Sequence, residues 1–286
     1  MVGLERTASS LFSSAVFRPI VSGRSTERGD ELVRHLRPEL GLSKRAANLD
    51  VVHGAHAVLR STYRSEYYYR NLLASKLFVG RHRASSQATL LNELAIDTSV
   101  ADCVLLNGHG VVFEIKTQLD RPEKLLGQLA SYYRAFPLVN VVVHEDDVDR
   151  YHEVVAEMAV GLWTVGNRYR LSVAKEPHPS TDSFEHRTLF NLLRAAEASS
   201  ILTGWYGSLP TIPNGRRYRE HLAMAEAIPV LQFQRLVQRE LKQRTFRGDR
   251  SLLIDASLEP LRAVLVQLNP AVADRDNLMR WLSRRS

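Results

Sequence analysis

Three short apolar segments follow one another between residues 89 and 117, and they restrict the fold more than any other part of the sequence. The segments read TLLNELAI, ADCVLL and VVFEIKT, and a turn-forming NGHG separates the last two. Apolar, β-branched runs of this length bounded by turn residues are typical of strands. The sequence therefore predicts three strands, of which the last two form a hairpin.

The segments on either side of these strands alternate between helical and extended patterns. Apolar residues at helical spacing predict a helix over 65–79 before the strands and another over 119–136 after them. Asp120 and Glu123 match a capping box at the start of the second helix. LVNVVVH, residues 138–144, is a continuous apolar run, as expected for a strand covered on both faces. A helix at 147–159 and strands at 161–166 and 168–174 complete the order α-β-β-β-α-β, then α-β-β.

The rest of the chain is predicted to be helical, which divides it into three regions. Residues 1–60 contain the start of a helix expected over 43–63, with Ser43 as its N-cap. The proline-containing KEPHPSTDS separates the core, residues 61–176, from a basic helical region, residues 177–286. The predicted fold class is α/β, with a mixed sheet of order αβββαβ between helical flanks.

Composition limits the classes of protein that this chain can belong to. The 286 residues are 44% hydrophobic and 24% charged, with a net charge of +7. No apolar run approaches the roughly 20 residues of a membrane span, so no membrane partner is expected. The single Cys103 excludes an internal disulfide and a cysteine-based zinc site, and favours a cytoplasmic location. Residues 61–184 hold 13 basic and 15 acidic residues between two basic zones, which suits a metal site among phosphate-binding surfaces.

Charged residues within the predicted strands point to chemistry. Glu114 and Lys116 are two residues apart and project from the same face of an apolar strand. Such buried charges cost free energy unless they are paired or used. Asp102 and Glu114 would repel each other unless a divalent cation lay between them, and carboxylate oxygens favour Mg²⁺ or Mn²⁺. Further candidates are Glu66, Glu93 and Gln128 on neighbouring elements, and Gln128 shares a helix stripe with Lys124 and Tyr132.

The pairing of the two hairpin strands decides whether this metal site can exist. A four-residue loop with Leu106 opposite Val111 would place Asp102 and Glu114 on opposite faces of the sheet. An odd-length connection, with Leu106 opposite Gly110, would place Asp102 directly across from Glu114. A three-residue hairpin loop favours glycine at its left-handed position, and the loop contains glycines. We therefore expect the odd-length connection.

The spacing of Asp102, eleven residues, Glu114, one residue and Lys116 resembles the PD-(D/E)XK nuclease superfamily, although Ala101 replaces the nominal proline. The stretches SEYYYRNLLASKLFVGRH, TLLNELAI, VADCVLLNGHGVVFEIKTQLDRPEKLLGQLASYYRAF and NGRRYR are more similar still to a bacterial family within it, the Sce family, known by a locus label. The resemblance is strong over about residues 60–145. It implies Asp102 and Glu114 as metal ligands and Lys116 as the catalytic lysine. Glu66 and Glu93 would be supporting acids, with Glu93 a possible third ligand, and Gln128 would point into the site.

The predicted function is a Mg²⁺- or Mn²⁺-dependent endonuclease that acts on DNA through a metal-activated water. Two other hypotheses stay open: a catalytically silent nucleic-acid-binding or regulatory protein on the same fold, and a protein-interaction module. Glu66 could simply pair with Arg70, and Glu93 could be a solvated surface acid. The cluster Arg216, Arg217 and Arg219 is a candidate for phosphate binding, against a solvated-surface interpretation. Nucleic acid is the expected partner, and a homodimer or a partner protein is an open alternative. Asp102→Asn or Glu114→Gln is expected to abolish cleavage without harming the fold.

Overall fold

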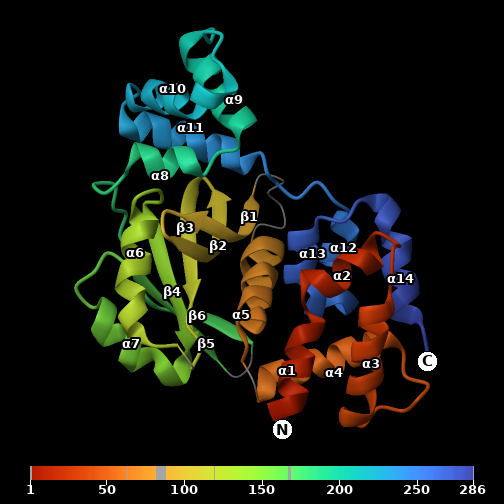
Figure 1. Ribbon diagram of the computed structural model, residues 1–286. Coiled ribbons are helices and arrows are strands. Elements are labelled where there is room, and N and C mark those ends of the chain that lie inside the picture. Colours follow the sequence, from red (N-terminus) through yellow and green to blue (C-terminus); the bar gives the residue numbers. More distant parts are fainter. Residues whose placement is uncertain (1, 63, 82–87, 119, 167–168, 286) are drawn as a thin grey trace. The chain divides into compact units, whose positions relative to one another are not determined.

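The computed structural model describes residues 2–62, 64–81, 88–118, 120–166 and 169–285 (Figure 1). The chain forms two compact units. The first comprises residues 1–84, 165–171 and 246–286, and the second comprises residues 85–164 and 172–245. These units do not follow the boundaries predicted at residues 60 and 176, because the C-terminal 41 positions, 246–286, belong with the N-terminal helices.

The first unit is mainly helical and is built from both ends of the chain. Its long-range ties are polar as well as apolar. The side chain of Asn48 donates a 2.9 Å hydrogen bond to the carbonyl of Trp281, which is itself buried. The helices are α1 (Val2–Leu11), α2 (Ser14–Val21), α3 (Glu27–Glu39), α4 (Asn48–Ser61), α5 (Glu66–Leu73), α12 (Arg250–Ile254), α13 (Arg262–Leu268) and α14 (Arg275–Ser283). A π-helical segment, Ala74–Arg81, continues α5, and a 3-10 segment covers Ala256–Leu261.

The second unit is an α/β domain around a six-stranded sheet. The strands are β1 (Thr89–Ile96), β2 (Ser99–Asn107), β3 (His109–Ile115), β4 (Leu138–His144), β5 (Gly161–Gly166) and β6 (Arg170–Lys175), and they lie in the order in which they occur in the chain. Residues 165 and 166 at the end of β5 and residues 170 and 171 at the start of β6 group with the first unit. Strands β1, β2 and β3 pair antiparallel, whereas β3 and β4 pair parallel. The sheet is therefore mixed, and the predicted α/β class is confirmed.

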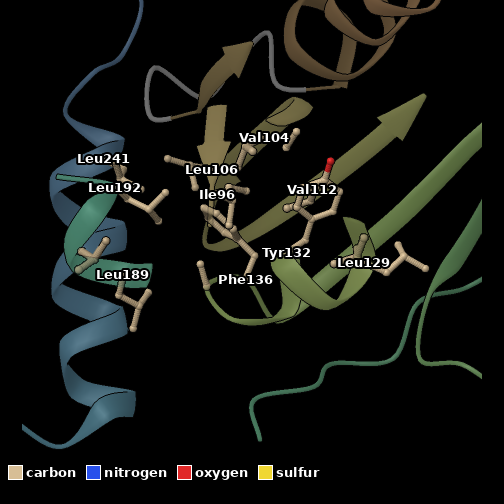
Figure 2. Close-up of a cluster of buried hydrophobic side chains, with 14 of the residues drawn as sticks. Ile96, Val104, Leu106, Val112, Leu129, Tyr132, Phe136, Leu189, Leu192 and Leu241 are labelled. Carbon is tan, nitrogen blue, oxygen red and sulfur yellow. The ribbon is translucent and has the colours of Figure 1, made fainter. Parts of the chain in front are cut away.

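Helices cover the sheet of the second unit and complete its core. They are α6 (Leu125–Tyr133), α7 (Val148–Val155), α8 (His186–Asn191), α9 (Ala195–Tyr206), α10 (Asn214–Glu226) and α11 (Val230–Lys242). Figure 2 shows side chains of β2 and β3, such as Leu106 and Val112, beside Tyr132 and Phe136 of the α6 segment. Leu189 of α8 and Leu241 of α11 join the same buried cluster. The predicted order α-β-β-β-α-β, then α-β-β, is confirmed.

The β2–β3 hairpin has the register that the sequence analysis favoured. Leu106 pairs with Gly110 and Asn107 pairs with His109, so the strands are connected by one residue, which is an odd length. That residue is Gly108, with a φ of 78°, in the left-handed region that glycine adopts without strain. Continuing this register by one residue places Asp102 across from Glu114.

Two predicted helix starts are wrong. The helix expected from Ser43 begins at Asn48, where the carboxylate of Asp50 accepts a 2.7 Å hydrogen bond from the backbone N–H of Ala47. The expected Asp120–Glu123 capping box does not form, because the Asp120 carboxylate accepts hydrogen bonds from the backbone and hydroxyl of Thr117 instead. A 3-10 turn, Pro122–Lys124, precedes α6. Residues 63, 119 and 168, which the predicted segments include, lie outside the described residues.

Across the part of the chain that the structure describes, every helix is too short or too polar to traverse a bilayer.

Candidate active site around Glu114

Glu114 occupies the penultimate position of β3, which lies between the antiparallel strand β2 and the parallel strand β4. On one side β3 pairs with β4, where Glu114 lies opposite Val141. On the other side the backbone pairing with β2 ends at Cys103 and Phe113. Beyond that point a side chain replaces the backbone pairing, because Oδ2 of Asp102 accepts a 2.7 Å hydrogen bond from the backbone N–H of Ile115. The carboxylates of Asp102 and Glu114 are thus brought to the place where β2 stops pairing with β3.

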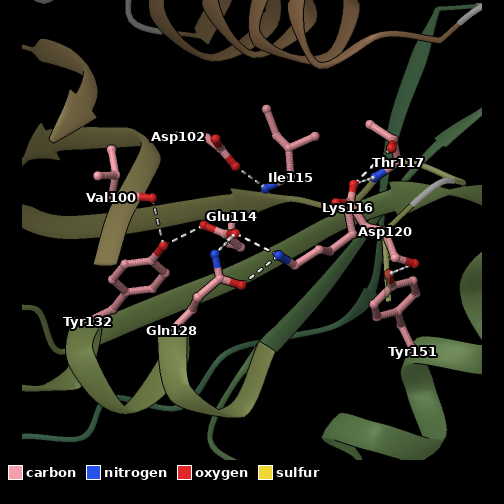
Figure 3. Close-up of polar contacts among 10 residues, drawn as sticks. All are labelled: Val100, Asp102, Glu114, Ile115, Lys116, Thr117, Asp120, Gln128, Tyr132 and Tyr151. Atoms are coloured by element: carbon pink, nitrogen blue, oxygen red, sulfur yellow. Dashed lines mark hydrogen bonds and ion pairs between the residues drawn. The ribbon is translucent and has the colours of Figure 1, made fainter. Parts of the chain in front are cut away.

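The Glu114 carboxylate is enclosed by three hydrogen-bond donors. Its Oε1 accepts from Lys116 Nζ at 2.8 Å and from Gln128 Nε2 at 2.6 Å, and its Oε2 accepts from the Tyr132 hydroxyl at 2.6 Å. Figure 3 shows these side chains converging from β3 and α6. Only 3% of Glu114 is exposed. Burying a carboxylate to this degree costs free energy unless hydrogen-bond donors such as these offset the lost hydration.

Lys116 lies one residue beyond β3, rather than on it as expected, and is fixed at both its backbone and its side chain. Its backbone N–H donates to the carbonyl of Val142 at 2.9 Å. Its ammonium donates to Glu114 and, at 2.6 Å, to Gln128 Oε1. An ammonium group has three donors, and its contacts with described residues account for two of them. Lys116 is only 5% exposed.

The loop after Lys116 is closed by its own polar contacts. Besides binding Thr117, Asp120 offers its backbone carbonyl to the side chains of Arg150 and Tyr151 at 3.2 and 3.4 Å. Figure 3 shows the contacts of Asp120 with Thr117 and Tyr151 beside Lys116. They tie the β3–α6 connection to α7, which limits the conformations open to the lysine.

Tyr132 is a site residue to which the sequence analysis gave no role beyond sharing a helix stripe with Gln128. Its hydroxyl donates to Glu114 and also lies 2.9 Å from the carbonyl of Val100. Burial raises the pKa of Tyr132 far above its usual range, and the negative charges of Glu114 and Asp102 raise it further. Tyr132 therefore stays protonated and keeps donating. Its spacing of four residues from Gln128, on one stripe of α6, is the signal that could have identified it.

The remaining predicted site residues do not all meet at Glu114. Glu93 is exposed on β1 and has a φ of 53°, which is rare for a residue with a side chain. Glu66 begins α5 in the first unit, and its Oε1 lies 3.2 Å from Nε of Arg70, as the simpler interpretation expected. Arg216, Arg217 and Arg219, here called the α10 arginine cluster, are all exposed, and Arg219 contacts Glu220 at 2.7 Å.

The donor set can be compared with what a metal ion needs. Within residues 2–62, 64–81, 88–118, 120–166 and 169–285, no three His, Cys, Asp or Glu side chains lie close enough together to hold an ion. The predicted trio of Asp102, Glu114 and Glu93 is therefore not assembled. The arrangement leaves a pair, Asp102 and Glu114, both with hard oxygen donors.

The sequence of the chain matches one protein-family model. Residues 59–260, more than half of the chain, match the model of the family described as bacteriophage P4 protein cII. The chain belongs to this family. The matched region includes Asp102, Glu114, Lys116, Gln128 and Tyr132. No curated protein and no solved structure matches the chain.

Proposed function

We propose that this protein is a metal-dependent nuclease that hydrolyses phosphodiester bonds in DNA, as expected from its resemblance to the PD-(D/E)XK superfamily. The observation that carries the proposal is the buried ammonium of Lys116, held by Glu114 and Gln128 next to Asp102. A fixed cation at a strand end, with one donor to spare, suits a phosphate oxygen or an attacking water. Asp102, whose carboxylate binds the backbone of Ile115, adds a second carboxylate at the same strand end.

The metal would be Mg²⁺ or Mn²⁺, held by Asp102 and Glu114. The residues fit such an ion, because Mg²⁺ is usually bound by one or two carboxylates and keeps several waters. The absence of a third acid from the group is compatible with this mode of binding. A divalent ion supplies a lowered pKa of water and charge neutralisation at a phosphate oxygen.

The residues of this chain would divide the remaining tasks. Lys116 would direct its third N–H at the phosphate or at the attacking water. Gln128 receives one N–H of Lys116 and donates to Glu114, so it fixes both side chains in one orientation. Tyr132 would hold Oε2 of the same carboxylate from the other side. The α10 arginine cluster would add phosphate contacts that position the nucleic acid.

A second candidate is a catalytically silent nucleic-acid-binding or regulatory protein. The specific observation in its favour is that three of the roughly four acceptor sites on the Glu114 carboxylate are already occupied by protein donors. A network this complete is stable without an ion. The two candidates agree on the ligand and differ on whether it is cleaved.

The deciding experiment is incubation of the purified protein with supercoiled plasmid and with single-stranded DNA, in the presence of Mg²⁺, Mn²⁺ or EDTA. The nuclease proposal expects cleavage with either ion and none in EDTA. Lys116→Ala should lower the cleavage rate by about 10²–10³-fold, the usual effect of removing one donor to transition-state charge, while DNA binding is retained. Lys124→Ala, which removes an exposed lysine that precedes α6, is the control and should cleave normally.

Each result separates the candidates. Binding without cleavage by the wild-type protein under all ion conditions would favour the silent binding protein. Cleavage by Lys116→Ala at the wild-type rate would exclude Lys116 from the chemistry. A parallel loss of binding and cleavage in that variant would make Lys116 a phosphate anchor.

A further inference from the structure

A groove of about 570 Å³ lies in the second unit, away from Glu114 along β3. It is bordered by the β2–β3 turn, the start of β4, the segment before α8, and α11. None of its lining residues is acidic, whereas three of them are arginine or lysine. The groove therefore has a positive potential that no carboxylate in its wall offsets.

The cations of the groove come from one face of α11. Arg235, Arg239 and Lys242 are spaced four and three residues apart, so their side chains follow one stripe of the helix. A rise of 1.5 Å per residue spreads them over about 10 Å along the helix axis. Arg235 and Arg239 are exposed, and no carboxylate among the described residues forms an ion pair with any of the three. Three intervals between neighbouring phosphates of one helically stacked strand, at about 3.4 Å each along the axis, cover the same length.

The groove is held open by polar contacts between α11 and its opposite wall. Gln238 Nε2 donates a 2.8 Å hydrogen bond to the carbonyl of Gly108, at the centre of the β2–β3 turn. Gln234, which is buried, donates to the carbonyl of Ala135 at 3.4 Å. These glutamines join the helix to the hairpin and to the end of the α6 segment, so the cation row stands at a fixed distance from the turn.

Apolar side chains line the groove beside the cations. Pro137, Leu138 and Phe184 come from outside α11, whereas Leu231, which is 46% exposed, lies on α11 one turn before Arg235. A row of cations along an apolar wall with an aromatic ring is the arrangement that binds single-stranded nucleic acid, because phosphates follow the cations and bases stack on the ring. A duplex presents its phosphates on a convex surface and keeps its bases stacked inside, so it would leave this wall unused.

We propose that this groove binds a single-stranded segment of nucleic acid, with phosphates on Arg235, Arg239 and Lys242 and a base against Phe184. The choice of nucleic acid as the ligand rests on the proposed function, whereas the charge and the shape of the groove do not. The groove lies at the start of β3 and Glu114 near its end, about 20 Å along the strand. It is thus a binding site separate from the candidate active site.

The test is fluorescence anisotropy of a labelled oligo-dT in EDTA, which measures binding without cleavage. Arg235→Ala with Arg239→Ala is the groove variant, and Arg28→Ala with Arg34→Ala is the matched control. The control removes two exposed arginines from the helix α3, with the same change in net charge. The groove variant should bind at least tenfold more weakly at low salt, and its salt slope should fall by about 1.4, or 0.7 for each lost contact with a single strand. Phe184→Ala should lose about tenfold in affinity with an unchanged salt slope.

Unchanged binding by the groove variant, or an equal loss in the control, would overturn the proposal. Poly-glutamate that displaces the oligonucleotide as well as unlabelled oligo-dT does would also overturn it and indicate an acidic peptide as the ligand. Cleavage assays separate this proposal from the nuclease proposal. If the wild-type protein never cleaves DNA but the groove variant alone loses binding, the groove proposal stands and the nuclease proposal falls.

Discussion

The buried pair of Glu114 and Lys116 makes a quantitative prediction about stability. The contact between Oε1 and Nζ is 2.8 Å, and both residues are at most 5% exposed. Glu114→Gln would leave the ammonium of Lys116 without its counter-charge, and breaking a buried pair in this way costs about 3–5 kcal/mol. Lys116→Met should cost a similar amount. The double variant removes both charges and should cost about 1 kcal/mol or less, because neutral replacements of buried pairs are often tolerated.

The assay is urea unfolding of the four proteins, followed by the fluorescence of the three tryptophans and by circular dichroism. Trp163 is a useful probe, because its ring lies 5.4 Å from that of Phe113, next to Glu114 in β3. Single losses of about 3 kcal/mol or more each, against about 1 kcal/mol or less for the double variant, correspond to a coupling energy of about 5 kcal/mol or more. Additive effects, or a Glu114→Gln protein as stable as wild type, would refute the assignment of a compensated buried pair. The sequence alone suggested that Glu114→Gln would leave the fold unharmed, and the contact with Lys116 reverses that expectation.

Three further predictions follow from single contacts. Tyr132→Phe should lower the free energy of unfolding by about 2 kcal/mol, because the Tyr132 hydroxyl binds a buried carboxylate. Tyr133→Phe should have little effect, because the Tyr133 hydroxyl has no partner among the described residues. Equal losses in the two variants would contradict this reasoning. Burial lowers the pKa of His56 in the folded protein. Below a pH of about 6.5 the unfolded chain therefore binds a proton at this histidine more readily than the folded chain does, and the free energy of unfolding falls as the pH falls. His56→Gln should flatten the melting temperature between pH 7 and 5, and the exposed His35→Gln should not. Neutralising the three arginines of the α10 arginine cluster should lower the salt slope of DNA binding by about two, because Arg219 already contacts a glutamate and only the other two are counted as phosphate contacts. An unchanged slope would mean that the cluster is solvated surface and does not bind phosphate.

Strand positions and pairing could be predicted because they depend on local patterns. The predicted strands 89–96 and 138–144 coincide with β1 and β4, since apolar runs bounded by turn residues leave few alternatives. The hairpin register followed from asking which pairing could bring Asp102 opposite Glu114. The left-handed Gly108 then made the odd-length connection accessible without strain.

Helix starts were harder to predict, because several side chains compete for the same backbone groups. Ser43 and Asp120 both match the preferences of an N-cap, yet neither caps its helix. Asp120 binds Thr117 across three residues, and this contact closes the loop that carries Lys116. Short polar side chains readily form such local contacts instead of caps, and sequence preferences do not rank the alternatives.

The contacts of the site depend on tertiary structure. Tyr132 reaches Glu114 because α6 packs on the sheet. The sequence of α6 alone does not predict which residues of the sheet its polar stripe will contact. The positive φ of Glu93 is equally invisible in the sequence. Its neighbours Asn92 and Leu94 pair with Cys103 and Ala101, so Glu93 stands beside Asp102 in the β1–β2 ladder. Strained backbone is often found at functional sites, and here it adjoins one of the two candidate ligands.

Lys116 has a second effect under the proposed function. The ammonium of Lys116 and the donors Gln128 and Tyr132 occupy three acceptor positions of the Glu114 carboxylate. One acceptor position, on Oε2, remains outside these three contacts. Asp102 and Glu114 would hold the divalent ion, which would supply charge neutralisation at a phosphate oxygen. The pair that stabilises the buried strand end would then also place the ammonium of Lys116 beside the substrate.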